Sequence, residues 1–327
     1  MTNSWQKNTS LPDNSVITGI SSVINGSENG SRDLWLCSPA GLFCQIDGTF
    51  QADIPGLSLP GASAVLANGK LVLAAGFPSA IVQSIDGGQS WFKSRVELID
   101  AVVSCFAASP TMPRDGIVFA GTDGDGVLRS TDSGSSWQPS NFGLGSLHVL
   151  GLACAPAWRR ETGSNSVLYN YEIVFAATED GVFMSPNAGR AWRFAGNGLP
   201  SATILSIAVS PDFKRIPDPT SAHYSGDVFA GTDGAGLYRS KDGGQSWQPV
   251  PSVATDLTVN SMLFDPQGKL YLGTGERGIL MSVDRGETWK TLLETEDVVL
   301  CLGTNGRQLL AGTAESGLLI LEDALSD

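Results

Sequence analysis

One eight-residue pattern, Ser-x-Asp-x-Gly-x-x-Trp, recurs along the chain and constrains its fold more than any other feature. Four copies are complete, and one has asparagine in place of aspartate. The copies run from Ser84 to Trp91, Ser130 to Trp137, Ser185 to Trp192 (the asparagine copy), Ser240 to Trp247 and Ser282 to Trp289. A motif that returns every ~40–55 residues predicts a repeat architecture, in which each unit buries its apolar face against its neighbours.

The residue types of the motif suit a tight turn between two strands. An aspartate side chain can accept hydrogen bonds from backbone N–H groups of its own turn. Glycine two residues later adopts positive φ without steric cost, and the tryptophan ring is large enough to fill the space between units. We therefore predict a structural role for the motif residues Asp86, Trp91, Asp132, Trp137, Asn187, Trp192, Asp242, Trp247, Asp284 and Trp289.

Each copy follows a preamble of an apolar strand, Gly-Thr, a short turn and a second apolar strand. Clear examples are IVFAGTDGDGVLRS (117–130), DVFAGTDGAGLYRS (227–240) and KLYLGTGERGILMS (269–282). With this preamble the chain resembles the Asp-box (bacterial neuraminidase repeat) β-propellers, which include sialidases, xyloglucan-cleaving hydrolases, sortilin-type receptors and photosystem II assembly factors. The resemblance covers nearly the whole chain. It implies an all-β propeller and does not select a function.

Aligned on these segments, the chain divides into seven units of four strands, so we predict one seven-bladed β-propeller domain over residues 1–327. The outer strand of the second unit is predicted over residues 91–98. The seventh unit ends after three strands, but Asn3–Lys7 matches the outer-strand segments at 135–139 and 245–249. We expect the N-terminal strand, about residues 2–8, to complete the last blade and leave no open sheet edge in the ring.

Composition restricts the partners and the compartment. The chain has 33 acidic and 20 basic residues, a formal net charge of −13. Nucleic acids and anionic membranes bind basic surfaces, so neither is an expected partner. No signal peptide or membrane-spanning run is visible, and five cysteines, mostly within apolar strands, favour a reducing, cytoplasmic location. The alternative is export, with a disulfide between Cys37 and Cys44.

Loops are where function is expected on a rigid ring of strands. Alternating strand direction places the turns between second and third strands, and the loops between units, on the face opposite the Asp boxes. This face forms a mostly acidic rim. Its candidate partner-binding residues are Phe77, Asp123, Asp125, Phe142, Glu179, Asp180, Asp233, Glu276 and Arg277.

A second candidate surface lies on the Asp-box face, where two long loops, 157–171 and 212–226, join first and second strands. They combine aromatic and basic residues, a composition typical of binding hot spots. The candidates are Trp158, Arg159, Arg160, Phe213, Lys214 and Arg215. The alternative is that the aromatic side chains simply seal the ends of two blades.

We expect no catalytic residue, cofactor or metal. His148 and His223 are the only histidines, and no cluster has metal-ligand spacing. The leading hypothesis is a non-catalytic, assembly-factor-like scaffold that presents loops to a protein partner. The alternative is a carbohydrate-binding module or glycoside hydrolase, because the acidic rim offers the paired carboxylates that such enzymes use. We favour the scaffold, since Asp and Asn also fill tight turns for structural reasons.

Overall fold

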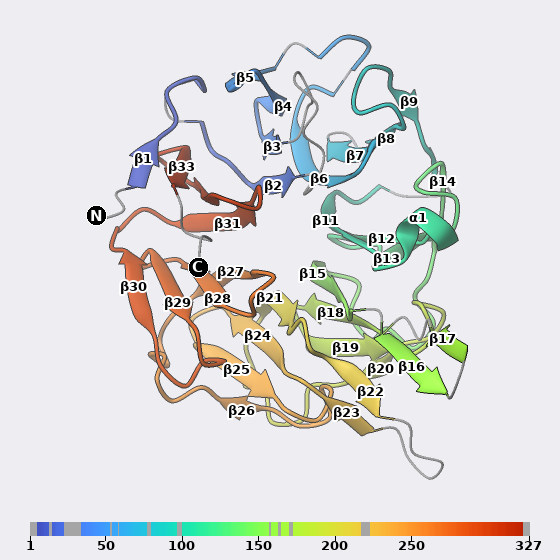
Figure 1. The fold of residues 1–327 in the computed structure, drawn as a ribbon, viewed down its shortest axis with the longest axis vertical. Helices are drawn as coiled ribbons and strands as arrows, with labels where there is room; N and C mark the ends of the chain where they lie inside the picture. Colours follow the sequence, from blue (N-terminus) through green and yellow to red (C-terminus); the bar gives the residue numbers. More distant parts are fainter. Residues whose placement is uncertain are drawn as a thin grey trace.

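Seven antiparallel sheets stand around a central axis, each with its first strand nearest the axis, and form a seven-bladed β-propeller (Figure 1). This arrangement confirms the all-β fold predicted from the repeats. The computed structural model describes residues 5–12, 15–22, 34–52, 54–57, 59–76, 80–96, 100–156, 158–162, 165–169, 173–216 and 223–322. For 158–162, 165–169, Arg215 and His223 it describes the backbone only.

The blades are numbered along the chain, and their strands follow from the inner to the outer edge. Blade 1 contains β2 (Gly19–Ser22), β3 (Leu34–Ser38), β4 (Gly41–Ile46) and β5 (Thr49–Gln51). Blade 2 contains β6 (Ala62–Asn68), β7 (Leu71–Gly76), β8 (Ala80–Ser84) and β9 (Phe92–Lys93). Blade 3 contains β11 (Val103–Ala108), β12 (Val118–Thr122), β13 (Val127–Ser130) and β14 (Ser136–Pro139), with a short helix, α1 (Met112–Asp115), between β11 and β12.

The remaining blades repeat this order. Blade 4 contains β15 (Val149–Cys154), β18 (Val174–Thr178), β19 (Gly181–Ser185) and β20 (Arg193–Phe194). Blade 5 contains β21 (Ile204–Val209), β24 (Val228–Thr232), β25 (Leu237–Ser240) and β26 (Gln248–Pro249). Blade 6 contains β27 (Val259–Phe264), β28 (Leu270–Thr274), β29 (Ile279–Ser282) and β30 (Lys290–Leu293). Blade 7 contains β31 (Val299–Thr304), β32 (Leu309–Thr313), β33 (Leu318–Leu321) and β1 (Trp5–Lys7).

The N-terminal strand completes blade 7, as predicted. β1 pairs antiparallel with β33, with Trp5 opposite Leu321 and Lys7 opposite Leu319. The indole Nε1 of Trp5 also donates a 3.0 Å hydrogen bond to the carbonyl of Leu292 in blade 6. The first strand of the chain is therefore joined to both the last and the sixth blade.

The outer strand predicted over 91–98 divides between two blades. At Ser94 the N–H still donates to Ile81 of blade 2, while the hydroxyl donates to the carbonyl of Gly134 in blade 3 at 2.6 Å. The chain then continues as β10 (Arg95–Val96), which pairs in parallel with β14. The prediction of one outer strand was wrong because Ser94 carries the chain across, and blade 3 gains a fifth strand.

The Gly-Thr of the preamble closes the turn between second and third strands. In blade 3 the hydroxyl of Thr122 donates to the carbonyl of Gly126 at 2.8 Å and accepts the N–H of Asp125 at 3.0 Å. Gly126 has φ of 77°, a conformation that favours glycine. This turn fixes the loops of the acidic face at the ends of buried strands.

Tryptophans of the repeat tie neighbouring blades through their indole N–H groups. Trp192 donates to the carbonyl of Ser140 at 2.7 Å, and Trp247 to that of Ala195 at 2.6 Å. Both acceptors lie three residues after the preceding tryptophan. For Trp289 of blade 6 the equivalent acceptor would be the carbonyl of Val250, which follows β26 of blade 5. That carbonyl accepts the N–H of Val253 instead. The buried Nε1 of Trp289 accordingly has no partner among the described residues.

This difference predicts that the same substitution lowers the free energy of unfolding by different amounts at the two tryptophans. Trp247→Phe is expected to lower the free energy of unfolding by about 1–3 kcal/mol more than Trp289→Phe, because only the former leaves a buried carbonyl unpaired. Urea denaturation of both variants measures the difference. Trp192→Phe is expected to follow Trp247→Phe; equal losses in all three would contradict the assignment.

The cysteines are reduced and line the apolar interior. Cys37, Cys44, Cys105, Cys154 and Cys301 are all free thiols. The alternative of a disulfide between Cys37 and Cys44 is thus absent from the structure. Burial raises the pKa of Cys105 to about 11 and that of Cys301 to about 12, which keeps both thiols protonated at neutral pH.

Candidate functional site

The Asp-box carboxylates are occupied by their own turns. In blade 5, Asp242 Oδ1 accepts the N–H groups of Gln245 (3.0 Å) and Ser246 (2.9 Å) and the hydroxyl of Ser240 (2.8 Å). Its Oδ2 accepts the hydroxyl of Ser246 at 2.6 Å. Asp132 and Asp284 are held in the same way by residues of their own boxes. These contacts are those of a turn staple.

The degenerate box shows what the second carboxylate oxygen does. Asn187 keeps the contacts of the first oxygen, accepting the hydroxyl of Ser185 at 3.0 Å and the N–H of Ala191 at 2.9 Å. Position 191 is alanine, whereas the complete boxes have a serine or threonine there that donates to the second carboxylate oxygen. Loss of the carboxylate is therefore paired with loss of its hydroxyl donor.

Acid is expected to weaken the complete boxes. The hydroxyl of Thr288, its N–H and the hydroxyl of Ser282 lower the pKa of Asp284 to about 2. A depressed folded-state pKa adds stability above the unfolded pKa of about 3.9, and this stability is lost as pH falls towards 2. Asp284→Asn is thus expected to be less stable than wild type at pH 7, with a difference that shrinks between pH 4 and pH 2.

Urea midpoints at several pH values measure this effect. Asp233→Asn, which removes an exposed carboxylate on the opposite face, is the control and is expected to show a much smaller difference at every pH. A gap between Asp284→Asn and wild type that stays constant from pH 7 to pH 2 would show that the box carboxylate is not the titrating group.

The structure places the candidate rim residues in four turns between second and third strands and in one loop between blades. Asp123 and Asp125 follow β12, Glu179 and Asp180 follow β18, Asp233 follows β24, Glu276 and Arg277 follow β28, and Phe142 lies between β14 and β15. Phe77 lies outside the described residues.

Some rim carboxylates hold loops together. Asp125 Oδ2 accepts the N–H groups of Asp100 and Ala101, both at 3.0 Å. Glu276 Oε2 accepts the N–H of Thr258 at 3.1 Å. Each bond joins the loop before an inner strand to a turn of the same blade. Asp125 and Glu276 therefore stabilise the loops, whereas Glu179, Asp180 and Asp233 are exposed on their turns.

His148 is a rim residue that sequence reasoning did not select. Its Nδ1 lies 2.7 Å from Oδ1 of Asp123, and both side chains are exposed. The hydrogen bond that the imidazole donates to Asp123, followed by the charge of Glu179, raises the pKa of His148 above its ordinary value. The signal for this pair was weak, because 25 residues separate the two positions and only the blade geometry unites them.

The second candidate surface consists of two hairpins between first and second strands, β16 (Trp158–Thr162) with β17 (Asn165–Tyr169) and β22 (Lys214–Ile216) with β23 (His223–Ser225). Figure 1 shows them over blades 4 and 5. Phe213 is 2% exposed and stacks on Tyr224, with ring centroids 5.7 Å apart. Its side chain belongs to the blade interior and is unavailable to a partner. Lys214 is exposed.

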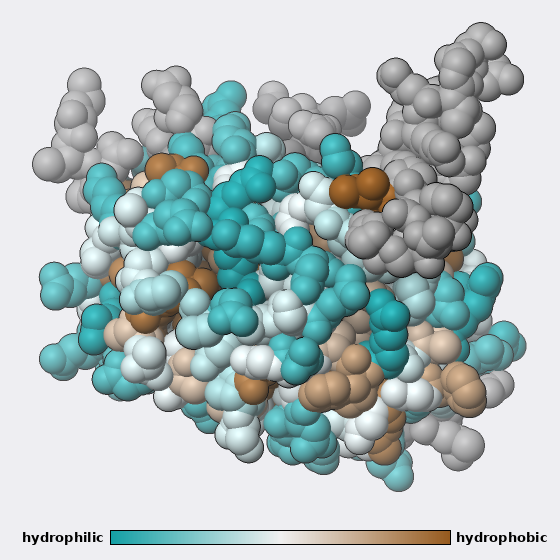
Figure 2. Space-filling view, turned by 90° about the horizontal axis from the view of Figure 1, so that it is seen from below, coloured by the Kyte–Doolittle hydropathy of each residue, from teal (hydrophilic) through white to brown (hydrophobic). Residues whose placement is uncertain are grey.

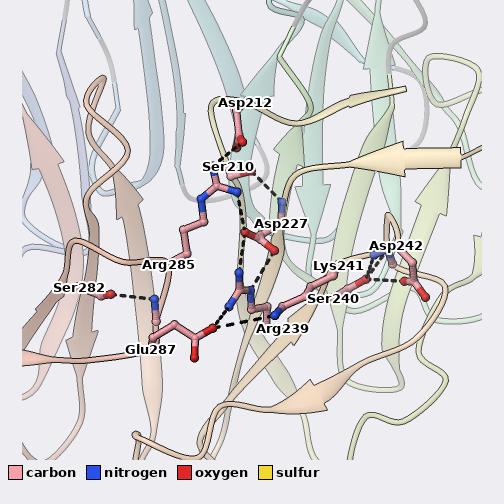
Figure 3. Close-up of polar contacts among 12 residues, drawn as sticks. Ser210, Asp212, Asp227, Arg239, Ser240, Lys241, Asp242, Ser282, Arg285 and Glu287 are labelled. Carbon is pink, nitrogen blue, oxygen red and sulfur yellow. Dashed lines mark hydrogen bonds and ion pairs between the residues drawn. The ribbon is translucent and has the colours of Figure 1, made fainter. Parts of the chain in front are cut away.

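A charge network joins blades 5 and 6 on the Asp-box side (Figure 3). Arg239 donates to both carboxylate oxygens of Asp227, at 2.9 and 3.0 Å, and to Glu287 at 2.8 Å. Arg285 lies 2.6 Å from Asp212 and 3.5 Å from Asp227. Asp227 is 4% exposed, so it is a buried carboxylate shared by two guanidinium groups. The network acts as a tie between blades.

A pocket of about 370 Å³ adjoins this network. Its walls include Arg239, Lys241, Gln248, Pro249, Pro251 and Glu287. A turn closed by the 3.1 Å hydrogen bond from the N–H of Val253 to the carbonyl of Val250 follows β26 beside this space. In this wall Glu287 lies 2.8 Å from Arg239 and 3.9 Å from Lys241.

Two further observations bear on the class of site. Within the described ranges, no group of three or more histidine, cysteine, aspartate or glutamate residues is arranged to hold a metal ion. None of the helices in the described part of the chain is long and apolar enough to cross a membrane.

Comparisons with known proteins support the fold. The BNR/Asp-box repeat profile matches residues 238–249, in blade 5, and a search of curated proteins finds no match. YCF48 bound to a D1 peptide is similar at 16% identity and a TM-score of 0.69, over 98% of this chain and 95% of that chain. The WD40 propeller domain of Doa1 has 10% identity and a TM-score of 0.70, over 99% and 98%.

The GH74 xyloglucanase from Xanthomonas campestris has 16% identity and a TM-score of 0.69. The match covers 99% of this chain and 54% of the xyloglucanase, so this chain spans about half the length of that enzyme. At these identities the likeness shows the fold alone. The chain is a seven-bladed propeller with BNR/Asp-box repeats, as the sequence resemblance predicted.

Proposed function

We propose that this propeller is a non-catalytic scaffold that presents its acidic face to a protein partner. The observation that carries the proposal is the state of the rim carboxylates. Asp125 and Glu276 fix loops of blades 3 and 6 by accepting backbone N–H groups. Glu179, Asp180 and Asp233 stand exposed on the turns of blades 4 and 5, which the hydroxyls of Thr178 and Thr232 close. Rigid turns that carry exposed charge favour steered association with a basic partner.

The solved structures fit this proposal without selecting it. The YCF48 structure contains a bound peptide, so a propeller of this shape can hold a protein segment. The second candidate function is carbohydrate binding. Exposed Phe142 and Phe194 near the acidic turns offer the apolar surface and hydrogen-bond acceptors that sugars use, and the xyloglucanase is a propeller-containing enzyme of similar fold.

Affinity capture from native extract at low salt tests the proposal with three altered baits. The first carries Glu179→Lys and Asp180→Lys. The second carries Asp233→Lys and Glu315→Lys; Glu315 is exposed on the turn between β32 and β33, on the same face. The third carries Arg159→Glu, Arg160→Glu and Lys214→Glu on the hairpin side. We expect a stoichiometric partner of the wild-type protein to be lost with at least one rim bait and kept by the hairpin bait.

The reverse pattern, loss with the hairpin bait alone, would contradict the choice of face. Absence of any partner, together with binding or cleavage of xyloglucan oligosaccharides, would replace the scaffold by the carbohydrate function.

A further inference from the structure

Exposed apolar side chains gather at one place on the acidic face. Seen from the side of the ring, hydrophilic residues cover much of the surface and apolar residues form small separate patches (Figure 2). Among the described residues, Phe142 is 80% exposed, Phe194 59% and Leu147 43%. All three belong to the boundary between blades 3 and 4. An exposed apolar cluster rimmed by polar residues is typical of a protein-binding surface.

The two phenylalanines are joined through the outer strand of blade 4. The carbonyl of Phe142 accepts the N–H of Trp192 at 2.8 Å, and Phe194 lies two residues further along. The ring of Phe194 packs edge-to-face on Phe183, with centroids 5.6 Å apart. The ring also lies directly beside Gly181: a side chain at this position would have its Cβ only 3.1 Å from the ring. Phe194 is therefore next to the turn that carries Asp180.

Leu147 connects this apolar surface to the acidic turn of blade 3. Its carbonyl accepts the N–H groups of Gly124 and Gly126, at 3.1 and 2.9 Å. The next residue, His148, contacts Asp123 through Nδ1, and its carbonyl accepts the N–H of Glu179 at 3.4 Å. The carboxylates of Asp123, Glu179 and Asp180 therefore border the apolar side chains, with one imidazole among them.

We propose that this rim patch, made of Asp123, Phe142, Leu147, Glu179, Asp180 and Phe194, binds an amphipathic basic segment of a protein partner. The inference rests on the proposed function and names the chemistry of its partner. Apolar side chains of the segment cover the two phenylalanines and the leucine, and lysine or arginine side chains meet the three carboxylates. The net charge of −13 also attracts a positively charged partner at long range.

The charged and the apolar side chains of the patch contribute to binding in different ways, because water solvates them differently. Exposed carboxylates in water contribute mostly to the association rate and to the choice of partner, and they are screened by salt. Burial of aromatic rings contributes most of the affinity at such surfaces. Both kinds of side chain must therefore be present for tight binding.

A labelled peptide of about 18 residues, or five helical turns, with leucine on one face and lysine on the other, is the probe. Fluorescence anisotropy measures its affinity for the full chain and two patch variants, Phe142→Ser with Phe194→Ser and Glu179→Gln with Asp180→Asn. The matched controls are Ile85→Ser with Val283→Ser, which removes exposed apolar groups on the Asp-box side, and Glu294→Gln with Glu296→Gln, which makes the same charge change at blade 6. Thermal unfolding checks that each variant is folded.

Each patch variant is expected to weaken binding about tenfold, and each control less than about twofold. A peptide with serine in place of leucine is expected to bind at least about tenfold more weakly than the leucine–lysine peptide. No binding by wild type, or equal effects of patch and control variants, would overturn the patch. If the native partner is lost with the Asp233 and Glu315 bait but kept by the Glu179 and Asp180 bait, the patch is wrong while the proposed function stands.

Discussion

Removal of residues 1–8 is expected to lower the free energy of unfolding by about 4–6 kcal/mol. The deletion takes away β1, the indole of Trp5 and its hydrogen bond to Leu292, and so exposes the edge of β33 and part of blade 6. For a chain of this size the midpoint of thermal unfolding should fall by about 10 °C or more. Circular dichroism during heating measures the shift.

A shorter deletion separates the strand from the residues before it. Removal of residues 1–4 leaves Trp5 and the whole of β1 in place and is expected to change the midpoint by less than about 2 °C. Equal midpoints for wild type and the longer deletion would show that the ring does not need its N-terminal strand.

The second large effect is expected at the buried carboxylate between blades 5 and 6. Asp227→Asn leaves Arg239, a cation only 13% exposed, without its bidentate partner. Breaking a buried ion pair on one side costs about 3–5 kcal/mol, and the guanidinium of Arg239 would then keep the exposed Glu287 as its carboxylate partner. Urea denaturation at neutral pH measures the loss.

Glu287→Gln is the matched control, since Glu287 binds the same guanidinium but is 65% exposed. Exposed ion pairs contribute about 0–1 kcal/mol, so this variant should be close to wild type. Similar losses in the two variants would mean that burial does not decide the strength of this network.

The repeats made the fold predictable, because each unit carries its own turn chemistry. Ser240 and Asp242 staple one turn, and Thr232 closes another, through residues within five positions along the chain. Local contacts of this kind are visible in the sequence. Even the unusual closure by β1 was readable, since Trp5 lies in a copy of a known outer-strand segment.

The features that the sequence did not reveal depend on contacts between units. Arg239 meets Glu287 across 48 residues, and β10 leaves its own blade because Ser94 binds Gly134 of the next. Phe213, chosen as a binding residue for its composition, is buried because the hairpin after it folds over blade 5. Residue type alone cannot distinguish a buried aromatic side chain from an exposed one.

Part of the rim patch was predictable from the sequence, and part of it was not. Phe142, Asp123, Glu179 and Asp180 follow from the alternation of strands, which places their loops on one face. Phe194 lies in an outer strand and was not selected. It joins the patch because the small Gly181 and Gly196 let its ring lie against the neighbouring turn.

Hydrogen–deuterium exchange of the propeller, with and without its captured partner, tests the central claim most directly, because it reports the bound face without any substitution. We expect slower exchange in the partner complex at residues 123–126, 141–148 and 178–181, and no change in the hairpin strands 214–216 and 223–225. Slower exchange confined to those hairpins, or to the walls of the pocket between blades 5 and 6, would contradict the assignment of the acidic face.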